Sequence, residues 1–386
     1  MNAAAPATFP ISLLCLSGSW GGLELNTVRF AGWMQQRGWP VQVITLPDAP
    51  IAARAAELGL PVALLCNPWK AADLPAAGRL HTLLTGFGTR TLLITRNGDL
   101  GLAVLCKSFY GPALKLIYQQ HMQLGVAKRG LVHTLRYRAL AAWLSPLPGL
   151  AREVLAQTRL PAGRLHVVPL GIELDKFAYA NLTQAQARAR LCLTLPVGAV
   201  LLGLIGRFDD GKGQDFVVRA LAGLRRRHPQ LHLLLVGEPT RDWAPSQRYY
   251  ADLLARLRAP DLAGAVHLRP FTPQPEVANR ALDIAVVAST NETYGMVTIE
   301  AMAAGLPVVA AATGGTLEIV ADGRTGLLFP LRDEAAFAAA IERLLAAPAL
   351  ARQLGQQAQA EALTVYSHQR QCELTEKVLF GIGNGE

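Results

Sequence analysis

Short apolar runs alternate with longer helical stretches along almost the whole chain. The runs are rich in Val, Ile, Leu and Ala, which is typical of strands buried on both faces of a parallel sheet. They lie at residues 11–16, 41–46, 91–94, 116–118, 166–169, 200–205, 232–236, 265–268, 284–288 and 308–311. The alternation predicts an α/β fold whose parallel sheets are covered by helices on both faces.

Two glutamates eight positions apart give the clearest chemical signal. Glu292 follows the strand-like run 284–289, and Glu300 lies near the start of a helix predicted over residues 297–304. The unpaired N–H groups of a helix N-terminus attract phosphate, so a phosphate bound there would lie between the two carboxylates. Each carboxylate can accept hydrogen bonds from sugar hydroxyls. The alternative is a pair of surface glutamates that flank a helix cap.

A glycine-rich turn gives a second signal. The strand-like run 200–205 leads into Gly-Arg-Phe-Asp-Asp-Gly-Lys-Gly, which is followed by an amphipathic helix. Arg207 and Lys212 stand five positions apart across this turn, so both cations can converge on one diphosphate and screen the charge that develops as it leaves. A solvated pair of cations that caps a loop is the alternative.

These motifs resemble the signature of retaining glycosyltransferases of family 4 (glycosyl transferases group 1), which have the GT-B fold of two Rossmann-like domains facing a cleft. The family's two glutamates correspond to Glu292 and Glu300, and the usual Glu-Gly-Phe-Gly is Glu-Thr-Tyr-Gly in this chain. The resemblance implies that Glu292 contacts the transferred sugar and that Glu300 binds the ribose. It also implies that Gly295 lets Met296 and Val297 present backbone N–H groups to the donor.

The resemblance assigns roles to residues elsewhere in the chain. Gly21 and Gly22, after the first strand-like run, would lie under the donor phosphates and sugar. His121 follows a short strand and would contact the donor sugar, with a structural histidine as the alternative. The loops that contain Glu238 and Phe271 would supply largely backbone contacts to the base.

The resemblance also predicts the domain organisation. A chain of 386 residues is long enough for two or three domains. We expect an N-terminal acceptor-binding domain at residues 1–172 and a C-terminal donor-binding domain at residues 173–360. Residues 361–386 would form a helix that crosses back to the first domain. The likeness is specific in residues 200–330 and looser in residues 1–170, which leaves the acceptor open.

The positive charge is concentrated in the first part of the chain. The net charge is +9, and residues 1–170 carry 16 Lys and Arg against 6 Asp and Glu. Within this part, residues 128–143 mix four cations with Leu and Trp and are interpreted as a basic amphipathic helix. Such a helix can lie on an anionic membrane or hold an anionic acceptor, and an ordinary solvated helix is the alternative. No recognition module accompanies the charge, which argues against nucleic acid as a partner.

No membrane span or export signal is visible, because the first apolar run is short and follows no basic segment. We therefore expect a cytoplasmic protein, and the basic segment adds peripheral attachment to the inner face of the membrane as an alternative to full solubility. The five cysteines are scattered singly and are interpreted as reduced core residues, without a disulfide or a metal site.

The function implied by the resemblance is transfer of a hexose-type sugar from a nucleotide diphosphate sugar to a carbohydrate or lipid-linked acceptor, in polysaccharide or glycolipid assembly. Glu292, Arg207, Lys212 and His121 would form the catalytic group, and no metal or other cofactor is expected because the two cations screen the diphosphate. The alternatives are a related nucleotide-sugar epimerase and a non-catalytic nucleotide-sugar-binding protein. A nicotinamide-dependent oxidoreductase is disfavoured because the Gly-x-Gly-x-x-Gly fingerprint is missing.

Overall fold

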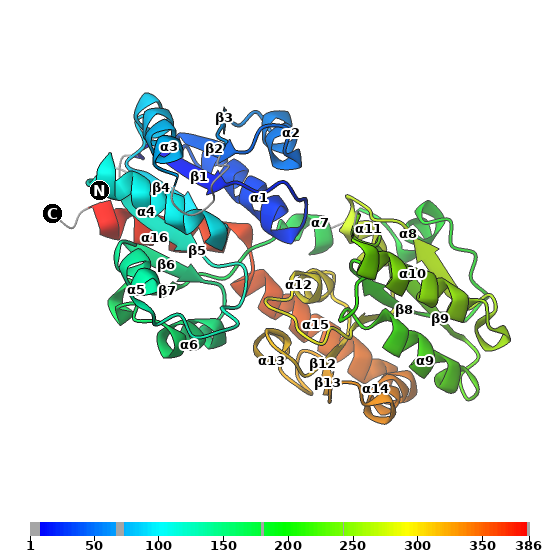
Figure 1. Ribbon diagram of the computed structural model, residues 1–386. Helices are drawn as coiled ribbons and strands as arrows, with labels where there is room; N and C mark the ends of the chain where they lie inside the picture. The colour runs from blue at the N-terminus through cyan, green and yellow to red at the C-terminus, as the bar shows by residue number, and fades with distance from the viewer. Residues whose placement is uncertain (1–7, 67–72, 179–180, 242, 384–386) are drawn as a thin grey trace, which may run out of the picture. The chain divides into compact units, whose positions relative to one another are not determined.

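The computed structural model describes residues 8–66, 73–178, 181–241 and 243–383, and the chain divides into two compact units (Figure 1). Unit 1 comprises Met1–Gly171 and His368–Glu386, and unit 2 comprises Ile172–Ser367. The sequence analysis placed the two boundaries after residues 172 and 360. The second boundary lies later in the structure because one helix, α15, continues within unit 2 to Val365.

Unit 1 contains a seven-stranded parallel sheet in the order β3-β2-β1-β4-β5-β6-β7. Its strands are β1 (Ile11–Cys15), β2 (Val41–Thr45), β3 (Val62–Leu64), β4 (Thr91–Ile94), β5 (Lys115–Gln119), β6 (Ala142–Ser145) and β7 (Leu165–Val167). β1 lies inside the sheet between β2 and β4, and all five of its residues are buried. The chain first adds β2 and β3 on one side of β1 and then adds β4 to β7 on the other side. The winding of the sheet therefore reverses between β1 and β4.

Helices cover both faces of this sheet, and each face has its own apolar core. The helices of unit 1 are α1 (Gly22–Gln36), α2 (Pro50–Glu57), α3 (Leu74–Gly86), α4 (Leu100–Phe109), α5 (Leu131–Arg138), α6 (Pro148–Gln157) and α16 (His368–Gly383), with short 3-10 turns η1 (Asn97–Asp99) and η2 (Ala162–Arg164). Successive strand side chains point to opposite faces. Leu13 accordingly packs in one core with residues of α1, α2 and α16, and Leu14 packs in the other with residues of α3 and α4.

The C-terminal helix α16 is an integral part of unit 1. Its Cys372, Val378 and Leu379 are buried in the same core as Phe30 of α1. At its surface, Arg37 donates two hydrogen bonds to Glu376, at 2.8 and 2.7 Å, and the indole N–H of Trp39 donates a third at 3.0 Å. The C-terminal helix therefore completes a hydrophobic core that is formed mainly by N-terminal residues.

Unit 2 contains a six-stranded parallel sheet in the order β10-β9-β8-β11-β12-β13. Its strands are β8 (Val200–Ile205), β9 (Leu231–Val236), β10 (Val266–Arg269), β11 (Ile284–Val287), β12 (Val308–Ala311) and β13 (Leu327–Phe329). Its helices are α7 (Leu174–Ala178), α8 (Gln184–Arg190), α9 (Gln214–Arg225), α10 (Ala244–Leu257), α11 (Pro275–Ala281), α12 (Met296–Ala303), α13 (Thr316–Ile319), α14 (Glu334–Ala346) and α15 (Pro348–Val365), with the 3-10 turn η3 (Pro260–Leu262). One core joins the sheet to α9 and α14 through Phe216, Phe329 and Phe337, whose rings contact one another.

The interpretation of residues 128–143 as one basic helix was wrong. Helix α5 spans only Leu131–Arg138, and Trp143 lies in strand β6, where its side chain is fully buried. The ring of Trp143 packs edge-on against Tyr118 and Tyr137, and its N–H donates to Gln120. These contacts favour a strand between β5 and β7 over continuation of the helix.

The cysteines are all free, as expected, but they are not all core residues. Cys15, Cys106 and Cys372 are buried, whereas Cys66 and Cys192 are exposed. Within the part of the chain that the structure describes, no helix combines the length and the apolar character that a membrane span requires.

Candidate active site

The carboxyl ends of β8 and β11 meet at the point where the winding of the unit 2 sheet reverses, since the order is β9-β8-β11-β12. Open α/β sheets bind ligands in the crevice at such a point. The loop after β8 contains Arg207 and Lys212, and the loop after β11 contains Glu292. The fold therefore brings the two predicted motifs to the same edge of one sheet.

Lys212 and Glu292 form an ion pair across this edge. The distance between Lys212 Nζ and Glu292 Oε2 is 3.0 Å, and the side chains are 30% and 13% exposed. A pair that keeps part of its surface exposed can exchange hydrogen bonds with a ligand, whereas a fully buried pair cannot. The geometry thus joins the cation predicted for phosphate and the carboxylate predicted for sugar into one group.

Arg207 lies at the rim of the same edge, where its side chain is 61% exposed. Its Nε is 3.3 Å from Asp209 Oδ2, and the hydroxyl of Thr240 donates to both Asp209 oxygens at 3.0 Å. Asp209 and Thr240 thus steer the guanidinium, and the sequence analysis assigned neither of them a role. The 31 residues that separate them hide the pairing from the sequence.

Glycines allow the backbone to approach closely around this site. Gly213, the N-cap of α9, has φ +80, and a β-carbon there would lie 2.3 Å from the Ala288 carbonyl oxygen. Gly237 has φ +154, and its β-carbon would lie 2.0 Å from the Gly206 carbonyl oxygen. The ends of β8, β9 and β11 can therefore approach one another only because these positions carry no side chain.

The loop that carries Glu292 is held by the Thr-Gly-Gly segment after β12. The N–H of Gly315 donates to the Glu292 carbonyl at 2.7 Å, and the Thr313 hydroxyl donates to the Ser289 carbonyl at 2.9 Å. Gly314 has φ +48, and a β-carbon there would lie 2.2 Å from the Glu292 carbonyl oxygen. This contact gives a physical reason for glycine at position 314.

Helix α12 begins directly after this loop. Its N-cap is Gly295, with φ +107. Met296 and Val297 are the first two residues of the helix, so their N–H groups have no carbonyl within the helix to bind. Both are partly exposed, while Glu300 lies one turn further along and is buried. Glu300 is therefore inside the helix and not at its first turn.

The other predicted donor contacts lie at the neighbouring strands. Glu238 follows β9, its side chain is exposed, and its carbonyl accepts a hydrogen bond from the N–H of Phe208 at 3.0 Å. Phe271 follows β10, and its ring is largely exposed. Since β10, β9 and β8 are adjacent and parallel, both residues lie at the same sheet edge as Arg207.

In unit 1, Gly21 and Gly22 lie at the start of α1, and Gly22 is the first residue of the helix. Gly21 is the N-cap of α1 in an extended conformation, and a β-carbon at Gly22 would meet no atom within 4 Å. Neither the backbone torsions nor the packing of this unit requires glycine at position 22. Beside them, the Ser17 hydroxyl donates to Glu24 at 2.5 Å, and both side chains are buried.

His121 follows β5 at the carboxyl edge of the unit 1 sheet. The residue keeps part of its surface exposed, but its ring Nε2 is buried and has no hydrogen-bond partner among the described residues. Burial lowers the pKa of the imidazole to about 4, so the ring is neutral at pH 7. The Gln119 side-chain oxygen, two residues earlier, is likewise buried without a partner in the described part of the chain. A neutral imidazole and an amide can both hydrogen-bond sugar hydroxyls.

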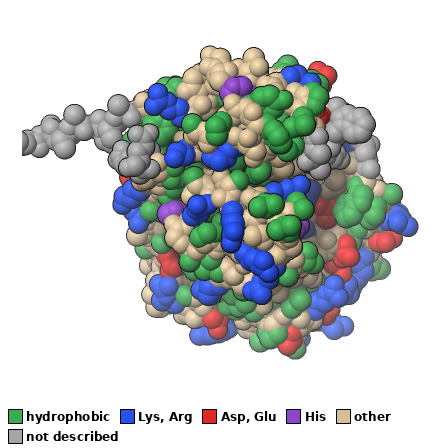
Figure 2. Space-filling view, turned by 60° about the vertical axis from the view of Figure 1, so that its left-hand side comes forward, with side chains coloured by type: hydrophobic (Ala, Val, Ile, Leu, Met, Phe, Trp, Pro, Cys, Tyr) green, Lys and Arg blue, Asp and Glu red, His purple; other side chains and the backbone are tan. Residues whose placement is uncertain are grey.

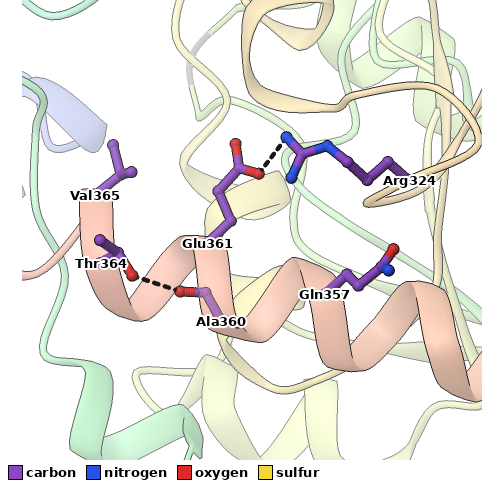
Figure 3. Close-up of a pocket in the computed structure, with 6 residues that line it drawn as sticks. All are labelled: Arg324, Gln357, Ala360, Glu361, Thr364 and Val365. Carbon is purple, nitrogen blue, oxygen red and sulfur yellow. Dashed lines mark hydrogen bonds and ion pairs between the residues drawn. The ribbon is translucent and has the colours of Figure 1, made fainter.

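A shallow pocket elsewhere in unit 2 contains none of the predicted site residues. Figure 3 shows it along one side of α15, with Glu361 turned toward Arg324. Their side chains form an ion pair at 2.7 Å. In the part of the chain that the structure describes, no group of three His, Cys, Asp or Glu side chains is placed to hold a metal ion.

Comparison with known proteins finds similarity in the second half of the chain. Residues 193–361 match the model of the family described as glycosyl transferases group 1. A D-inositol 3-phosphate glycosyltransferase of Stackebrandtia nassauensis is 39% identical over 199 residues, which is 50% of this chain and 44% of that protein. The chain spans about half the length of the curated relatives it matches.

Solved structures share the fold over nearly the entire chain. The glycosyltransferase of Rickettsia africae covers 98% of this chain and is itself covered over its full length, with a TM-score of 0.87 and 16% identity. The HepE protein of Anabaena in complex with UDP and glucose has a TM-score of 0.80 and 21% identity, with 96% of this chain and 98% of that protein covered. Both sheets, all parallel, are therefore arranged within the GT-B fold, which confirms the fold class predicted from the sequence. Residues 193–361 are thus similar to glycosyl transferases group 1, as the resemblance of their motifs indicated.

Proposed function

We propose that this chain is a retaining glycosyltransferase that moves a hexose-type sugar from a nucleotide diphosphate sugar to an acceptor hydroxyl. The observation that carries the proposal is the 3.0 Å ion pair between Lys212 and Glu292 at the reversal point of the unit 2 sheet. This pair brings the cation that we assign to phosphate and the carboxylate that we assign to the sugar close enough to bind one ligand. Support also comes from the family match over residues 193–361.

The two cations have different tasks in this proposal. Lys212 has three N–H donors, and its hydrogen bond to Glu292 uses one of them, so the others can bind phosphate oxygens. Helix α9 begins two residues after Lys212 and adds the partial positive charge of its N-terminus. Arg207 offers a planar fork that suits a second phosphate. Together they stabilise the charge that develops on the leaving diphosphate.

Retention follows if the acceptor attacks from the side on which the diphosphate leaves. The bond between the anomeric carbon and the phosphate oxygen breaks, the acceptor oxygen forms the new bond to that carbon, and the acceptor proton passes to the departing phosphate oxygen. Glu292 then orients the sugar and stabilises its positive charge without forming a covalent bond. His121, as a neutral ring, would hold a sugar hydroxyl from unit 1.

The proposed donor is a UDP-sugar, because the similar structure from Anabaena contains UDP and glucose. The N–H groups of Met296 and Val297 would bind the diphosphate, and Glu300 the ribose hydroxyls. Glu238 and Phe271, at the ends of β9 and β10, would contact the base. No metal is needed in this scheme, because Arg207 and Lys212 supply the positive charge that a metal ion would bring.

For the acceptor we propose a carbohydrate or lipid-linked hydroxyl in polysaccharide or glycolipid assembly, reached by a cytoplasmic protein that attaches peripherally to the inner face of an anionic membrane. Residues 100–152 contain seven Lys and Arg and no Asp or Glu. Within them Leu131, Val132 and Leu135 of α5 are each more than half exposed. Figure 2, which brings the side of unit 1 forward, shows Lys and Arg next to hydrophobic side chains. Exposed apolar residues among cations favour an anionic bilayer surface.

The test is nucleotide release from UDP-, GDP- and ADP-sugars by the purified full chain in the presence of a chelator. Lys212→Ala and Arg207→Ala should each lower the rate by about 10²–10³-fold, the loss typical of removing one group that stabilises transition-state charge. Arg324→Ala is the matched control for Arg207, because Arg324 is 59% exposed and holds one ion pair in the same unit. It should keep the wild-type rate.

The outcomes separate the proposal from its alternatives. Release from one donor that is lost in both site variants and kept in the control supports the transferase. Conversion of the donor into an isomeric sugar without nucleotide release supports the epimerase, and donor binding without turnover supports a binding protein. Equal losses in all three variants would contradict the assignment of the site. Sedimentation with anionic but not neutral vesicles, weakened by Leu135→Glu, tests the membrane contact.

A further inference from the structure

A second polar cluster lies in unit 1, where β1 and β4 end at the reversal point of that sheet. Asp99, in η1, is only 1% exposed. Its Oδ2 accepts a hydrogen bond from the N–H of Leu16 at 2.8 Å. Arg96 donates to the Leu16 carbonyl at 2.6 Å and to Asp99 Oδ1 at 3.1 Å. The two side chains therefore bind both backbone polar groups of one residue and each other.

This arrangement continues the sheet beyond its last backbone hydrogen bonds. β1 and β4 pair in parallel as far as Leu14 and Ile94, and the N–H of Thr95 still donates to the Leu14 carbonyl at 3.2 Å. At Leu16 the backbones no longer pair, and Arg96 and Asp99 replace the missing partner strand. A buried N–H and carbonyl without partners would each cost about 1–3 kcal/mol, so the cluster fixes the position at which the chain leaves the sheet.

The segment anchored in this way is the glycine-rich loop 17–22. Its first residue, Ser17, donates a hydrogen bond to Glu24 of α1, the helix into which the loop leads. Between these anchors, β-carbons at Gly18 and Gly22 would meet no atom within 4 Å. The start of the loop is thus fixed to the sheet and to α1, while its glycines leave open backbone, which is the form of a ligand-binding loop at the switch point of a parallel sheet.

We propose that Arg96 and Asp99 are positioning residues for the transfer reaction: they hold loop 17–22 in the conformation that binds the transferred sugar. This inference rests on the proposed glycosyltransferase function. Neither residue touches the substrate in it. Both act through the backbone of Leu16, so their effect on the reaction passes through the loop.

The cluster also gives the loop a dependence on pH. Burial raises the pKa of Asp99 to about 6. The other groups that face it are Arg96, the Cys15 thiol of β1 and the Tyr118 hydroxyl of β5. Burial raises the pKa of Cys15 to about 12, and it also raises the pKa of Tyr118. Among these groups, Asp99 alone changes charge near pH 6, and its protonation below that pH breaks the ion pair with Arg96.

Three variants of the full chain test the proposal. Asp99→Leu removes the contact to Leu16, and Asp99→Asn keeps an acceptor for the Leu16 N–H but removes the charge. Asp73→Leu is the matched control, because Asp73 is also a buried aspartate of unit 1 that accepts a backbone N–H at 2.8 Å, at the start of α3. Hydrogen exchange of the peptide covering residues 16–22 reports on the loop. Nucleotide release reports on the reaction, and UDP binding by calorimetry reports on unit 2.

We expect Asp99→Leu to speed exchange of the loop and to lower kcat/KM, each at least tenfold, with the Kd for UDP unchanged. Asp73→Leu should leave loop exchange at the wild-type rate. Wild-type kcat should fall as the pH drops through about 6, and Asp99→Asn should lose that acid limb. Unchanged loop exchange in Asp99→Leu, or an acid limb that persists in Asp99→Asn, would overturn the proposal. A wild type that neither binds nor cleaves any donor would refute the proposed function instead, while the exchange experiment would still decide whether the cluster holds the loop.

Discussion

The junction between Lys212 and helix α9 gives a sharp test of how the donor site is built. Gly213 is the N-cap of α9 in the left-handed region, with φ +80 and ψ 16. A β-carbon there would lie 2.3 Å from the carbonyl oxygen and 2.7 Å from the β-carbon of Ala288, at the end of β11. The left-handed conformation costs a residue with a side chain about 1–2 kcal/mol. Relief of the overlap requires movement of backbone, which adds about 1–3 kcal/mol.

Gly213→Ala should therefore destabilise the protein by about 2–5 kcal/mol, which lowers the melting temperature of a unit of this size by about 4–20 °C. The matched control is Gly223→Ala in the same helix. A β-carbon at Gly223 has only the tip of Arg226 near it, at 3.9 Å. Because glycine inside a helix costs about 0.5–1 kcal/mol relative to alanine, this variant should be more stable than wild type. The same change from glycine to alanine is thus expected to lower the stability of the protein at position 213 and to raise it at position 223.

Thermal unfolding followed by circular dichroism measures both shifts, and nucleotide release below the melting temperature measures the site. Gly213→Ala should lose activity even where it is folded, because the displaced junction moves Lys212 away from Glu292. Wild-type melting of Gly213→Ala would refute the steric argument. Destabilisation by Gly223→Ala would also refute the steric argument. A loss of stability at both positions would mean that α9 tolerates no added β-carbon, so the contact between Gly213 and Ala288 would not be the cause.

Two further substitutions test contacts that join distant parts of the chain. Gly237→Ala places a β-carbon 2.0 Å from the Gly206 carbonyl oxygen, so it should destabilise the protein by about 3 kcal/mol or more, seen as a lower melting temperature together with slower nucleotide release. Glu376→Gln keeps an acceptor for Trp39 but breaks the charged pair with Arg37, and urea unfolding should show a loss of about 1 kcal/mol. Because hydrogen bonding to Arg37 lowers the pKa of Glu376, this difference should be present at neutral pH and vanish as the pH falls through that lowered pKa.

Much of the fold could be predicted from the sequence because buried parallel strands leave a local signal. The strands that were missed, β3, β6 and β13, have three or four residues each. β6 was missed for a specific reason: its apolar residues follow a basic segment at a spacing that also fits a helix. The contact of Trp143 with Tyr118 of β5 favours a strand, and the sequence does not show it because the two residues are 25 positions apart.

In the candidate site, too, residues in local sequence motifs could be predicted, whereas residues that depend on partners far away in the sequence could not. Lys212 and Glu292 could be singled out because each lies in its own glycine-containing motif, although 80 residues separate them. Thr240, Arg96 and Asp99 lie in no predicted motif, and Asp209, although it lies in the same turn as Lys212, was assigned no role. Their importance comes from partners that only folding brings near, as when Asp99 reaches the backbone of Leu16, 83 residues earlier. A sequence identifies side chains that would meet a ligand more readily than those that hold them in place.

The polar side chains at the reversal points of the two sheets differ in exposure, and this difference indicates which of them can bind a ligand and which can only hold a loop in position. In unit 2, the pair that spans the point, Lys212 and Glu292, keeps part of its surface exposed, and its atoms have hydrogen-bonding capacity left for a ligand. In unit 1, Asp99 is buried, and both of its oxygens are already used by Leu16 and Arg96. A side chain whose capacity is exhausted inside the protein cannot bind substrate, so its charge acts on the loop and not on the ligand. We therefore expect loss of Lys212 to weaken the binding of a nucleoside diphosphate and loss of Asp99 to leave it intact, even where both changes slow the reaction.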